Sequence, residues 1–387
     1  MNWMMRLAIF ITFVIVFIGV IAFARGYRID FRKKSLTSTG IIAISSYPKA
    51  AKVYVNGELK GVTDINLSLA YGKYEVEVKK EGYTTWSKKI SLKGELVESV
   101  DVLLFPINPS LTPLTNLGVV KAIPLDQGEK ILLFSQNGSE RDGIYLFNPN
   151  SRPISFLPPL KLIVAKTKLP ADVDFSKVVV DFSPDAKQVI VEFDNGFIYL
   201  LTLDEENKEP SLITVESKNN LILAWEEEKN MEIAKIIETF PKDLRKIASD
   251  SFHIVSFSPD KTKFIFQPEN EMIIPQIIKP PLIATNQTPE ERSLNKNNLY
   301  LYDLKEDKNF RIQNSAILWY PDSRHLIINE ETKIAIVDYD NTNKQIVYSG
   351  PFEKDFLTVT DNGKIVILTN LNSQLNKFPD VYAVGIK

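Results

Sequence analysis

The distribution of apolar residues divides the chain into three parts. Leu7 to Ala24 form an unbroken run without a charge, LAIFITFVIVFIGVIAFA. Residues 41–105 alternate apolar and polar positions, and residues 106–387 repeat a short polar turn followed by an apolar run. The first pattern predicts a membrane-crossing helix, the second a small sheet domain, and the third a larger domain of similar β units.

The N-terminal run is interpreted as a transmembrane anchor over residues 1–24, with a cleaved signal peptide as the alternative. Arg6 before the run and the small residues of Ala22-Phe23-Ala24 also fit a signal peptide. We favour the anchor because the run is long for a signal peptide and because a basic linker, residues 25–40, follows at once. Its basic residues are Arg25, Arg28, Arg32, Lys33 and Lys34. This charge bias favours a body on the cytoplasmic side of the membrane.

Residues 41–105 are predicted to form a small β-sandwich. In the stretch YEVEVK, Tyr74, Val76 and Val78 fall on one face and the charged residues between them on the other. Asn56-Gly57 and Tyr71-Gly72 mark tight turns, because Asn and Gly tolerate positive φ.

This segment resembles the PEGA domain through the stretches YPKAAKVYVNGELKGVT and LAYGKYEVEVKKEGYTTW. It departs from the family pattern at Ala50, where Gly is usual, and at Asp64, where Pro is usual. The resemblance implies an extracytoplasmic, surface-associated sandwich that supports contacts with protein or carbohydrate and has no catalytic residues. This location disagrees with the one that the charge bias favours. Tyr83 and Trp86 are candidates for a sugar-binding platform, although packing in the core and rim is the favoured interpretation.

Five turns containing Asp, each followed by a β-rich run, are spread over residues 106–387. They are LDQGEKILLF from Leu125, FSPDAKQVIVEF from Phe182, FSPDKTKFIF from Phe257, YPDSRHLIIN from Tyr320 and TDNGKIVILT from Thr360. One such unit cannot bury both faces alone, so repeated units stack around an axis. The turns resemble those of TolB-type and WD-repeat-like β-propellers, although the usual Gly after Asp is missing from SPDA, SPDK and YPDS.

The resemblance implies a β-propeller over residues 106–387. We predict six blades, with seven as the alternative, and assign residues 212–225 as a weak blade. A ring must join its ends, so the C-terminal strand, residues 381–386, should lie beside early strands of this domain.

Two insertions interrupt the repeat. Ile233, Ile236, Ile237 and Phe240 follow helical spacing and predict a helical insertion over residues 226–250. It is interpreted as a helical pair packed on the propeller, with a partner-binding helix as the alternative. Residues 268–298 form a Pro-rich loop, either a binding loop or a surface covering. Its candidate binding residues are Ile277, Ile278, Pro280, Pro281 and Arg292.

Composition and charge narrow the function class. The chain is 44% hydrophobic and 24% charged, which is typical of a folded protein. It has no cysteine, which excludes disulfides, thiolate metal sites and cysteine nucleophiles. Residues 35–387 contain 40 basic and 47 acidic residues, so nucleic acid is not expected as a partner.

Catalytic motifs are absent from the sequence. It contains no GxSxG, P-loop, GxGxxG or HExxH pattern, and its two histidines, His253 and His325, lie in or beside strands, where packing is favoured over catalysis. Residues 338–343 superficially suggest a calcium loop but lack its Gly and closing Glu, so a polar hairpin turn is favoured. No metal or cofactor is predicted.

We therefore predict a membrane-anchored, extracytoplasmic scaffold without enzymatic activity. It would bind protein or envelope polysaccharide through the propeller rim and the PEGA-like domain. The alternative is a propeller-type hydrolase, of the glycosidase or peptidase-associated kind, with an unidentified carboxylate site.

Overall fold

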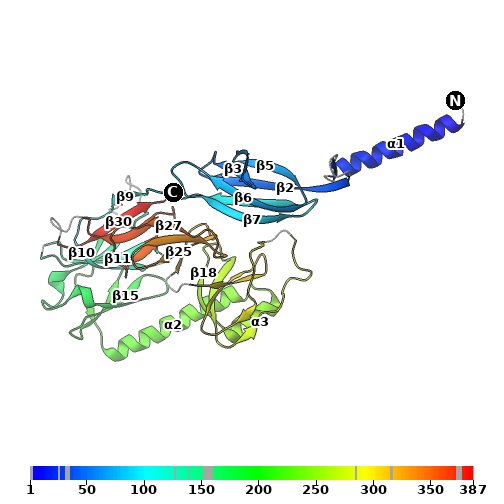
Figure 1. Cartoon of the computed structure of the whole chain (residues 1–387). Coiled ribbons are helices and arrows are strands. Elements are labelled where there is room, and N and C mark those ends of the chain that lie inside the picture. Colours follow the sequence, from blue (N-terminus) through cyan, green and yellow to red (C-terminus); the bar gives the residue numbers. More distant parts are fainter. Residues whose placement is uncertain are drawn as a thin grey trace. The chain divides into compact units, whose positions relative to one another are not determined.

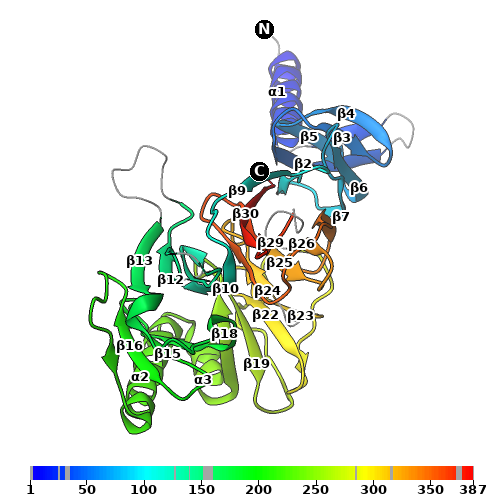
Figure 2. The ribbon, with the colours of Figure 1, turned by 90° about the vertical axis from the view of Figure 1, so that its left-hand side faces the viewer.

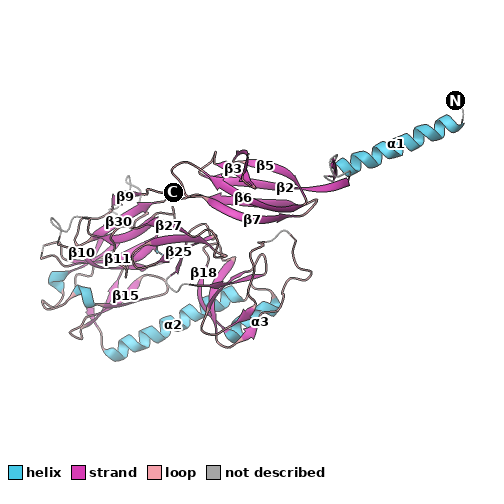
Figure 3. Ribbon diagram, in the orientation of Figure 1, coloured by secondary structure: helices cyan, strands magenta, loops and turns pink. Residues whose placement is uncertain are grey.

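The computed structural model describes residues 3–24, 27–30, 35–125, 128–138, 140–150, 160–283, 286–313, 317–371 and 377–386. It divides into two compact units (Figure 1). The first unit comprises Met1–Ile107 and Ile278–Pro289, and the second comprises Asn108–Ile277 and Glu290–Lys387. Strands dominate both units (Figure 3), so the chain is mainly β with an apolar helix at its N-terminus.

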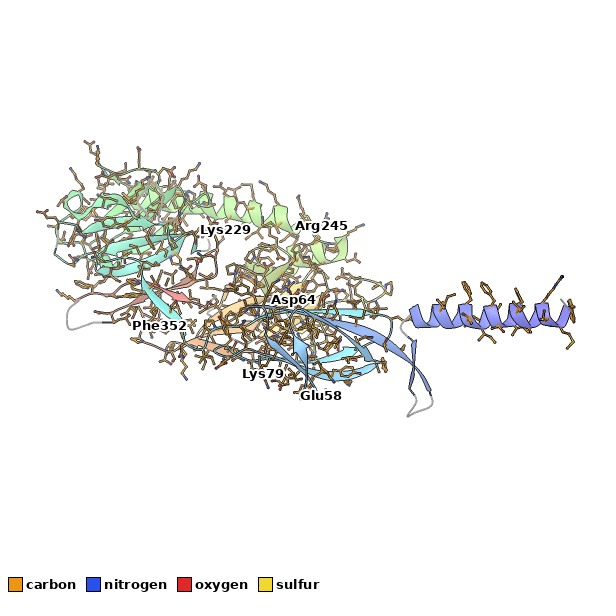
Figure 4. All side chains as sticks on the ribbon, turned by 90° about the horizontal axis from the view of Figure 1, so that it is seen from above. Glu58, Asp64, Lys79, Lys229, Arg245 and Phe352 are labelled. Atoms are coloured by element: carbon orange, nitrogen blue, oxygen red, sulfur yellow. The ribbon has the colours of Figure 1, made fainter. Side chains whose placement is uncertain are left out.

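Helix α1 (Trp3–Ala24) opens the first unit. Over Trp3–Ile21 its mean hydropathy is 2.6 and none of it is buried. The side chains of Trp3–Ile21 project away from the helix (Figure 4). Length and composition are therefore sufficient to cross a membrane, and they also fit a signal sequence.

The rest of the first unit is a sandwich of two four-stranded sheets. In one sheet β2 (Ser35–Tyr47) pairs with β1 (Tyr27–Asp30), β5 (Ile65–Ala70) and, in parallel, β8 (Val97–Leu103). The other sheet has the order β4 (Glu58–Val62), β3 (Lys52–Val55), β6 (Gly72–Lys79), β7 (Trp86–Leu92).

Alternate residues of these strands form the core, as the period-2 pattern predicts. Ile42 and Ile44 of β2 are buried together with Val76 and Val78 of β6 and Ile90 of β7. The intervening residues face outward because successive side chains of a strand point to opposite faces. The predicted linker over residues 25–40 is not only a linker, since β1 and the start of β2 form a hairpin within it.

The second unit contains, among the described residues, five four-stranded antiparallel sheets. The first sheet consists of β10 (Val119–Leu125), β11 (Lys130–Ser135), β12 (Gly143–Phe147) and β13 (Leu160–Ala165). The second consists of β14 (Val179–Phe182), β15 (Gln188–Glu192), β16 (Ile198–Thr202) and β17 (Ser211–Leu212). The third consists of β18 (Phe252–Phe257), β19 (Lys263–Pro268), β22 (Leu299–Asp303) and β23 (Lys308–Ile312). The fourth consists of β24 (Ile317–Trp319), β25 (His325–Asn329), β26 (Ile334–Asp338) and β27 (Gln345–Tyr348). The fifth consists of β28 (Leu357–Val359), β29 (Ile365–Thr369), β30 (Asp380–Gly385) and β9 (Ser110–Pro113). Short 3-10 helices, η2 (Lys166–Lys168) and η3 (Phe175–Lys177), join the first sheet to the second.

Apolar clusters join these sheets face to face. Leu132 and Phe134 of the first sheet pack with Val189 and Val191 of the second. Further clusters join the third sheet to the fourth and the fifth to the first. The fully buried strands are continuous apolar runs because both of their faces are covered.

The first strand of the second unit pairs with its last. In β9 and β30, Ser110 lies opposite Gly385 and Pro113 opposite Tyr382. The two strands lie side by side in Figure 2. The predicted position of the C-terminal strand beside early strands is thereby confirmed.

The region predicted as a weak blade is a helix. Helix α2 (Val215–Ile237) begins at Val215, with the Thr214 side chain accepting from Ser217 N as N-cap. Residues 212–225 therefore form no further sheet, so they do not supply the sixth blade that was predicted there. The helical insertion begins earlier than residue 226 and continues in α3 (Lys242–Ser251). Leu221, Ile222 and Trp225 lie at helical spacing on α2, so the strand predicted for this segment is wrong.

Helix α3 and the end of α2 pack on the third sheet. Ile237, Phe240, Leu244 and Ala248 are buried against β18, β19 and β22. This contact agrees with the favoured interpretation of the insertion as a packed helical pair.

The repeated turn has one geometry at several places. Ser183 Oγ donates to Asp185 Oδ1 at 2.7 Å and accepts from Gln188 N at 2.9 Å. The same pattern recurs for Ser258 with Asp260 and Lys263, and for Thr360 with Asn362 and Lys364. The residue after the Asp or Asn has positive φ in these three turns, at Ala186 (53°), Lys261 (56°) and Gly363 (81°), and also in the YPDS turn, at Ser323 (60°). The missing Gly thus leaves the turn conformation intact.

Candidate binding surface

The two aromatic residues proposed for a sugar platform are packed instead. Trp86 on β7 is 7% exposed and belongs to the core between the two sheets of the first unit. Tyr83 is half-buried against the same core and forms an isolated β-bridge with Pro106. A sugar needs an open aromatic face, which Trp86 does not offer. The packing interpretation is therefore the one that agrees with the structure.

The two ends of the Pro-rich loop, which we call its base, are held by contacts within the second unit. Strands β20 (Met272–Ile273) and β21 (Ser293–Leu294) pair with each other and close it. Beside them the carboxylate of Asp307, 1% exposed, accepts from Gln276 Nε2 at 2.7 Å, Ile277 N at 2.8 Å and Tyr302 Oη at 2.5 Å. Burial and this carboxylate raise the pKa of Tyr302 far above its usual range.

Arg292, a candidate binding residue, belongs to this base. Its Nη2 lies 3.1 Å from Asp307 Oδ1, its Nε lies 3.0 Å from Glu290 Oε2, and its Nη1 donates to Pro275 O. Burial lowers the pKa of Arg292, but the two carboxylates outweigh it and hold the pKa above its ordinary value. The guanidinium is thus engaged in holding the two ends of the loop together.

The middle of the loop belongs to the first unit. Gln287 accepts from Ser91 N at 2.7 Å and donates to Ser91 O at 3.0 Å. Strand β7 is an edge of its sheet, so the side-chain amide of Gln287 satisfies backbone groups that a neighbouring strand would otherwise pair. No sequence pattern marked Gln287 or Asp307 for these roles, because both are ordinary loop residues whose partners are distant in sequence.

The remaining candidates divide by exposure. Ile277 and Ile278 are half-buried, and Ile277 packs against the apolar cluster of α3 and β19. Pro280 and Pro281 are exposed, and so are Leu282 and Ile283, at 47% and 62%. The structure thus brings four exposed apolar residues together in one stretch, Pro280 to Ile283, and two of these were not among the predicted residues.

The basic residues after the anchor are mostly beyond the described part. Arg25, Arg32, Lys33 and Lys34 lie outside the described residues, and Arg28 lies in β1 without a described side chain. Their predicted role beside a membrane stays a prediction.

Within the described part of the chain, neither histidine belongs to a recognisable catalytic arrangement. His253 is exposed on β18, whereas His325 is buried, with Nδ1 2.6 Å from Asp322 Oδ2 and Nε2 3.2 Å from Asp338 Oδ1. Burial opposes protonation, but the two carboxylates outweigh it and raise the pKa of His325 to about 9. An imidazolium held on both sides is a structural ion pair rather than a general base at neutral pH.

The acidic turn over residues 338–343 closes on itself. Thr342 Oγ1 donates to Asp340 Oδ1 at 2.6 Å, and Asn343 Nδ2 donates to Asp338 Oδ2 at 2.9 Å. Over the described ranges, no group of three or more His, Asp or Glu residues could hold a metal ion. These contacts agree with the polar hairpin interpretation.

Comparison with known proteins finds a family match for the sandwich of the first unit. Residues 39–107 match the family model of the PEGA domain. No curated protein matches the chain. Among solved structures, a chain of "Crystal Structure of Mitotic Checkpoint Complex" is similar over 73% of this chain and 96% of that chain, with 8% sequence identity and a TM-score of 0.31. A TM-score this low carries no argument.

Proposed function

We propose that this chain is a single-pass membrane protein whose two β units form a binding scaffold without enzymatic activity outside the cytoplasm. The observation that carries the proposal is the PEGA-domain match over residues 39–107, directly after an apolar helix. PEGA domains are extracellular, and a 22-residue helix is about 33 Å long, enough to span a bilayer. The basic flank after α1 argues for the opposite orientation, so topology is the first property to test.

The second unit is a five-bladed β-propeller in this proposal. Five antiparallel sheets of four strands, three shared apolar clusters and the β9–β30 pairing support it. In such a propeller, the pairing of β9 with β30 would join the two ends of the ring of sheets, because the first strand of the unit completes the last sheet. Such a frame gives loops a rigid base from which to bind.

The contact surface is the exposed stretch Pro280–Ile283, and the partner is a protein. Prolines and aliphatic residues offer apolar area and few hydrogen-bonding groups, which suits a protein partner better than a polysaccharide. Gln287, four positions after Ile283, is hydrogen-bonded to Ser91 of the same unit, which reduces the conformational entropy that this part of the loop can lose on binding.

Topology can be tested with single cysteines, because the chain has none of its own. Val179→Cys places a thiol at a residue that is 55% exposed in the second unit. We expect a membrane-impermeant maleimide to label it on intact cells. Labelling only after lysis would place the body in the cytoplasm and reject the proposal, and a mature protein beginning after Ala24 would reject the anchor.

Partner binding can be tested by photo-crosslinking from Ile283, with Ile346 as matched control. Both are exposed isoleucines, at 62% and 49%. We expect a crosslink to a discrete protein from position 283 that disappears in a Leu282→Ser and Pro281→Ser background. Equal crosslinking from both positions would contradict a specific surface at the loop.

A further inference from the structure

Three backbone hydrogen bonds define one end of the PEGA-like sandwich. Tyr71 N, in the β5–β6 turn, donates to Ser38 O at 3.1 Å. Glu95 N, in the β7–β8 turn, donates to Thr39 O at 2.9 Å, and Ile41 N donates to Leu96 O at 2.9 Å. Both turns therefore close on the same stretch of β2. We call residues 38–41, 70–73 and 93–97 the proximal rim.

The end of α1 is tied to this rim by the β1–β2 hairpin. Tyr27 on β1 lies opposite Ser38 on β2, and Tyr27 follows the last helical residue, Ala24, by three positions. Three extended residues span at most about 11 Å. The helix end thus lies within a short distance of the residue that also receives the Tyr71 hydrogen bond.

The connection between the helix end and the rim is comparable in length with the headgroup layer of a bilayer. Helix α1, with 22 residues, is about 33 Å long and so crosses a hydrocarbon core of about 30 Å. The headgroup regions add roughly 5 to 8 Å on each side. With α1 in the bilayer, the short connection keeps the proximal rim close enough to the helix end to reach the headgroup layer.

The side chains of the rim suit that layer. Tyr71 is 68% exposed, Val97 57% and Ile41 38%. Lys73 and Lys93 are exposed in the same rim. Tyrosine favours the membrane interface, and lysine can bury its aliphatic stem while its ammonium reaches a phosphate.

We propose that the proximal rim rests on the lipid surface, with Tyr71, Val97 and Ile41 in the interfacial layer and Lys73 and Lys93 on anionic headgroups. The inference rests on the proposed function in one respect, that α1 remains as a transmembrane helix. It goes beyond a flexible tether, because a second contact with the membrane limits how the sandwich can tilt.

The test uses the full chain in phospholipid vesicles that contain spin-labelled lipids. Tyr71→Cys and Val97→Cys variants each carry an environment-sensitive fluorophore. Val62→Cys is the matched control, since Val62 is 50% exposed and its neighbour Thr63 contacts Ser46 at the other end of β2. Ser46 is eight residues along the strand from Ser38, or about 26 Å. Ile15→Cys within α1 reports the anchor itself.

We expect headgroup-depth quenching at positions 71 and 97 that is severalfold stronger than at position 62, together with deep quenching at position 15. Anionic lipid should strengthen the quenching at 71 and 97, and salt should weaken that gain. Deep quenching at position 15 with equal, weak quenching at 97 and 62 would overturn the rim contact alone. Absence of deep quenching at position 15 would reject the transmembrane anchor, and with it the rim contact. Unchanged thermal unfolding of each labelled variant shows that the fold is retained.

Discussion

At the scale of single residues, the repeated turns hold non-glycine residues in a conformation that glycine adopts more easily. Ala186 has φ 53° and Lys261 has φ 56°, in the position that follows the Asp of the turn. A left-handed conformation costs a residue with Cβ about 1–2 kcal/mol. The hydroxyl and carboxylate hydrogen bonds of each turn outweigh this cost, and so the turn persists without Gly.

The first prediction is that Ala186→Gly and Lys261→Gly each stabilise the second unit. Relief of left-handed strain, about 1–2 kcal/mol, exceeds the ~0.4–1 kcal/mol that extra freedom of Gly in the unfolded chain costs. The denaturant midpoint of unfolding should rise. Ala234→Gly in α2 is the control with the opposite sign, since Gly in a helix costs about 1 kcal/mol. A lower midpoint for both turn variants would contradict the strain argument.

The second prediction concerns pH and His325. Its folded pKa of about 9 lies above the ordinary value of 6.5, so its stabilisation is fully present below pH 6.5 and is lost as pH rises toward 9. The loss in unfolding free energy should be on the order of 3 kcal/mol. His325→Gln should flatten the stability profile between pH 6.5 and 9, whereas the exposed His253→Gln should leave it unchanged. A profile that is flat in the unmodified protein would refute the ion pair.

At the scale of elements, the edge strand β7 is covered by a side chain rather than by another strand. An edge strand presents unpaired backbone groups that promote pairing with other chains. Gln287 provides one donor and one acceptor in the geometry of a strand partner, and both reach the same residue, Ser91. A segment of the Pro-rich loop is thereby held on the first unit.

The third prediction is that Gln287→Ala accelerates hydrogen exchange of the Ser91 amide. Loss of hydrogen bonds worth about 1.4 kcal/mol corresponds to a tenfold change in local opening. Gln267→Ala is the matched control, since its Nε2 also donates to a backbone carbonyl, that of Lys296. Unchanged exchange at Ser91 in the Gln287 variant, or equal acceleration in both, would argue against a specific role for Gln287.

At the scale of the whole molecule, the last strand of the chain has two neighbours that are far from each other in sequence. Strand β30 pairs with β29 on one side and with β9 on the other. Val384 and Ile386 are fully buried. The end of the chain is therefore part of the core of the second unit.

The fourth prediction is that deletion of Tyr382–Lys387 destabilises the second unit cooperatively. Two large buried aliphatic residues are lost, each worth about 1.5–3 kcal/mol, and the edges of β9 and β29 are left unpaired. Hydrogen exchange should increase in strands throughout this unit, while amides of β6 in the first unit serve as internal control. Increased exchange confined to β9 and β29 would indicate that these strands close no cooperative ring.

Much of the fold could be predicted from the sequence because it depends on local regularities. The uncharged run predicted α1, period-2 alternation predicted the core positions of β6, and the Asp-containing turns preceded β15, β19, β25 and β29. The extent of α2 was not predicted, since Leu221, Ile222 and Trp225 are apolar residues that suit a strand or a helix. The structure shows a helix that begins at Val215 behind the Thr214 cap.

The candidate site required the tertiary structure. Whether Trp86 faces a ligand or the core depends on which sheet covers β7. The contacts of Arg292 with Asp307, and of Gln287 with Ser91, join residues 15 and 196 positions apart. The sequence by itself determined the chain's division into an uncharged apolar run, a segment of period-2 alternation whose motifs resemble the PEGA domain, and a region of repeated turns and β-rich runs, because each is a local pattern. Only the tertiary structure decided which polar and aromatic side chains are packed or hydrogen-bonded within the protein and which remain exposed, because their partners are distant in sequence.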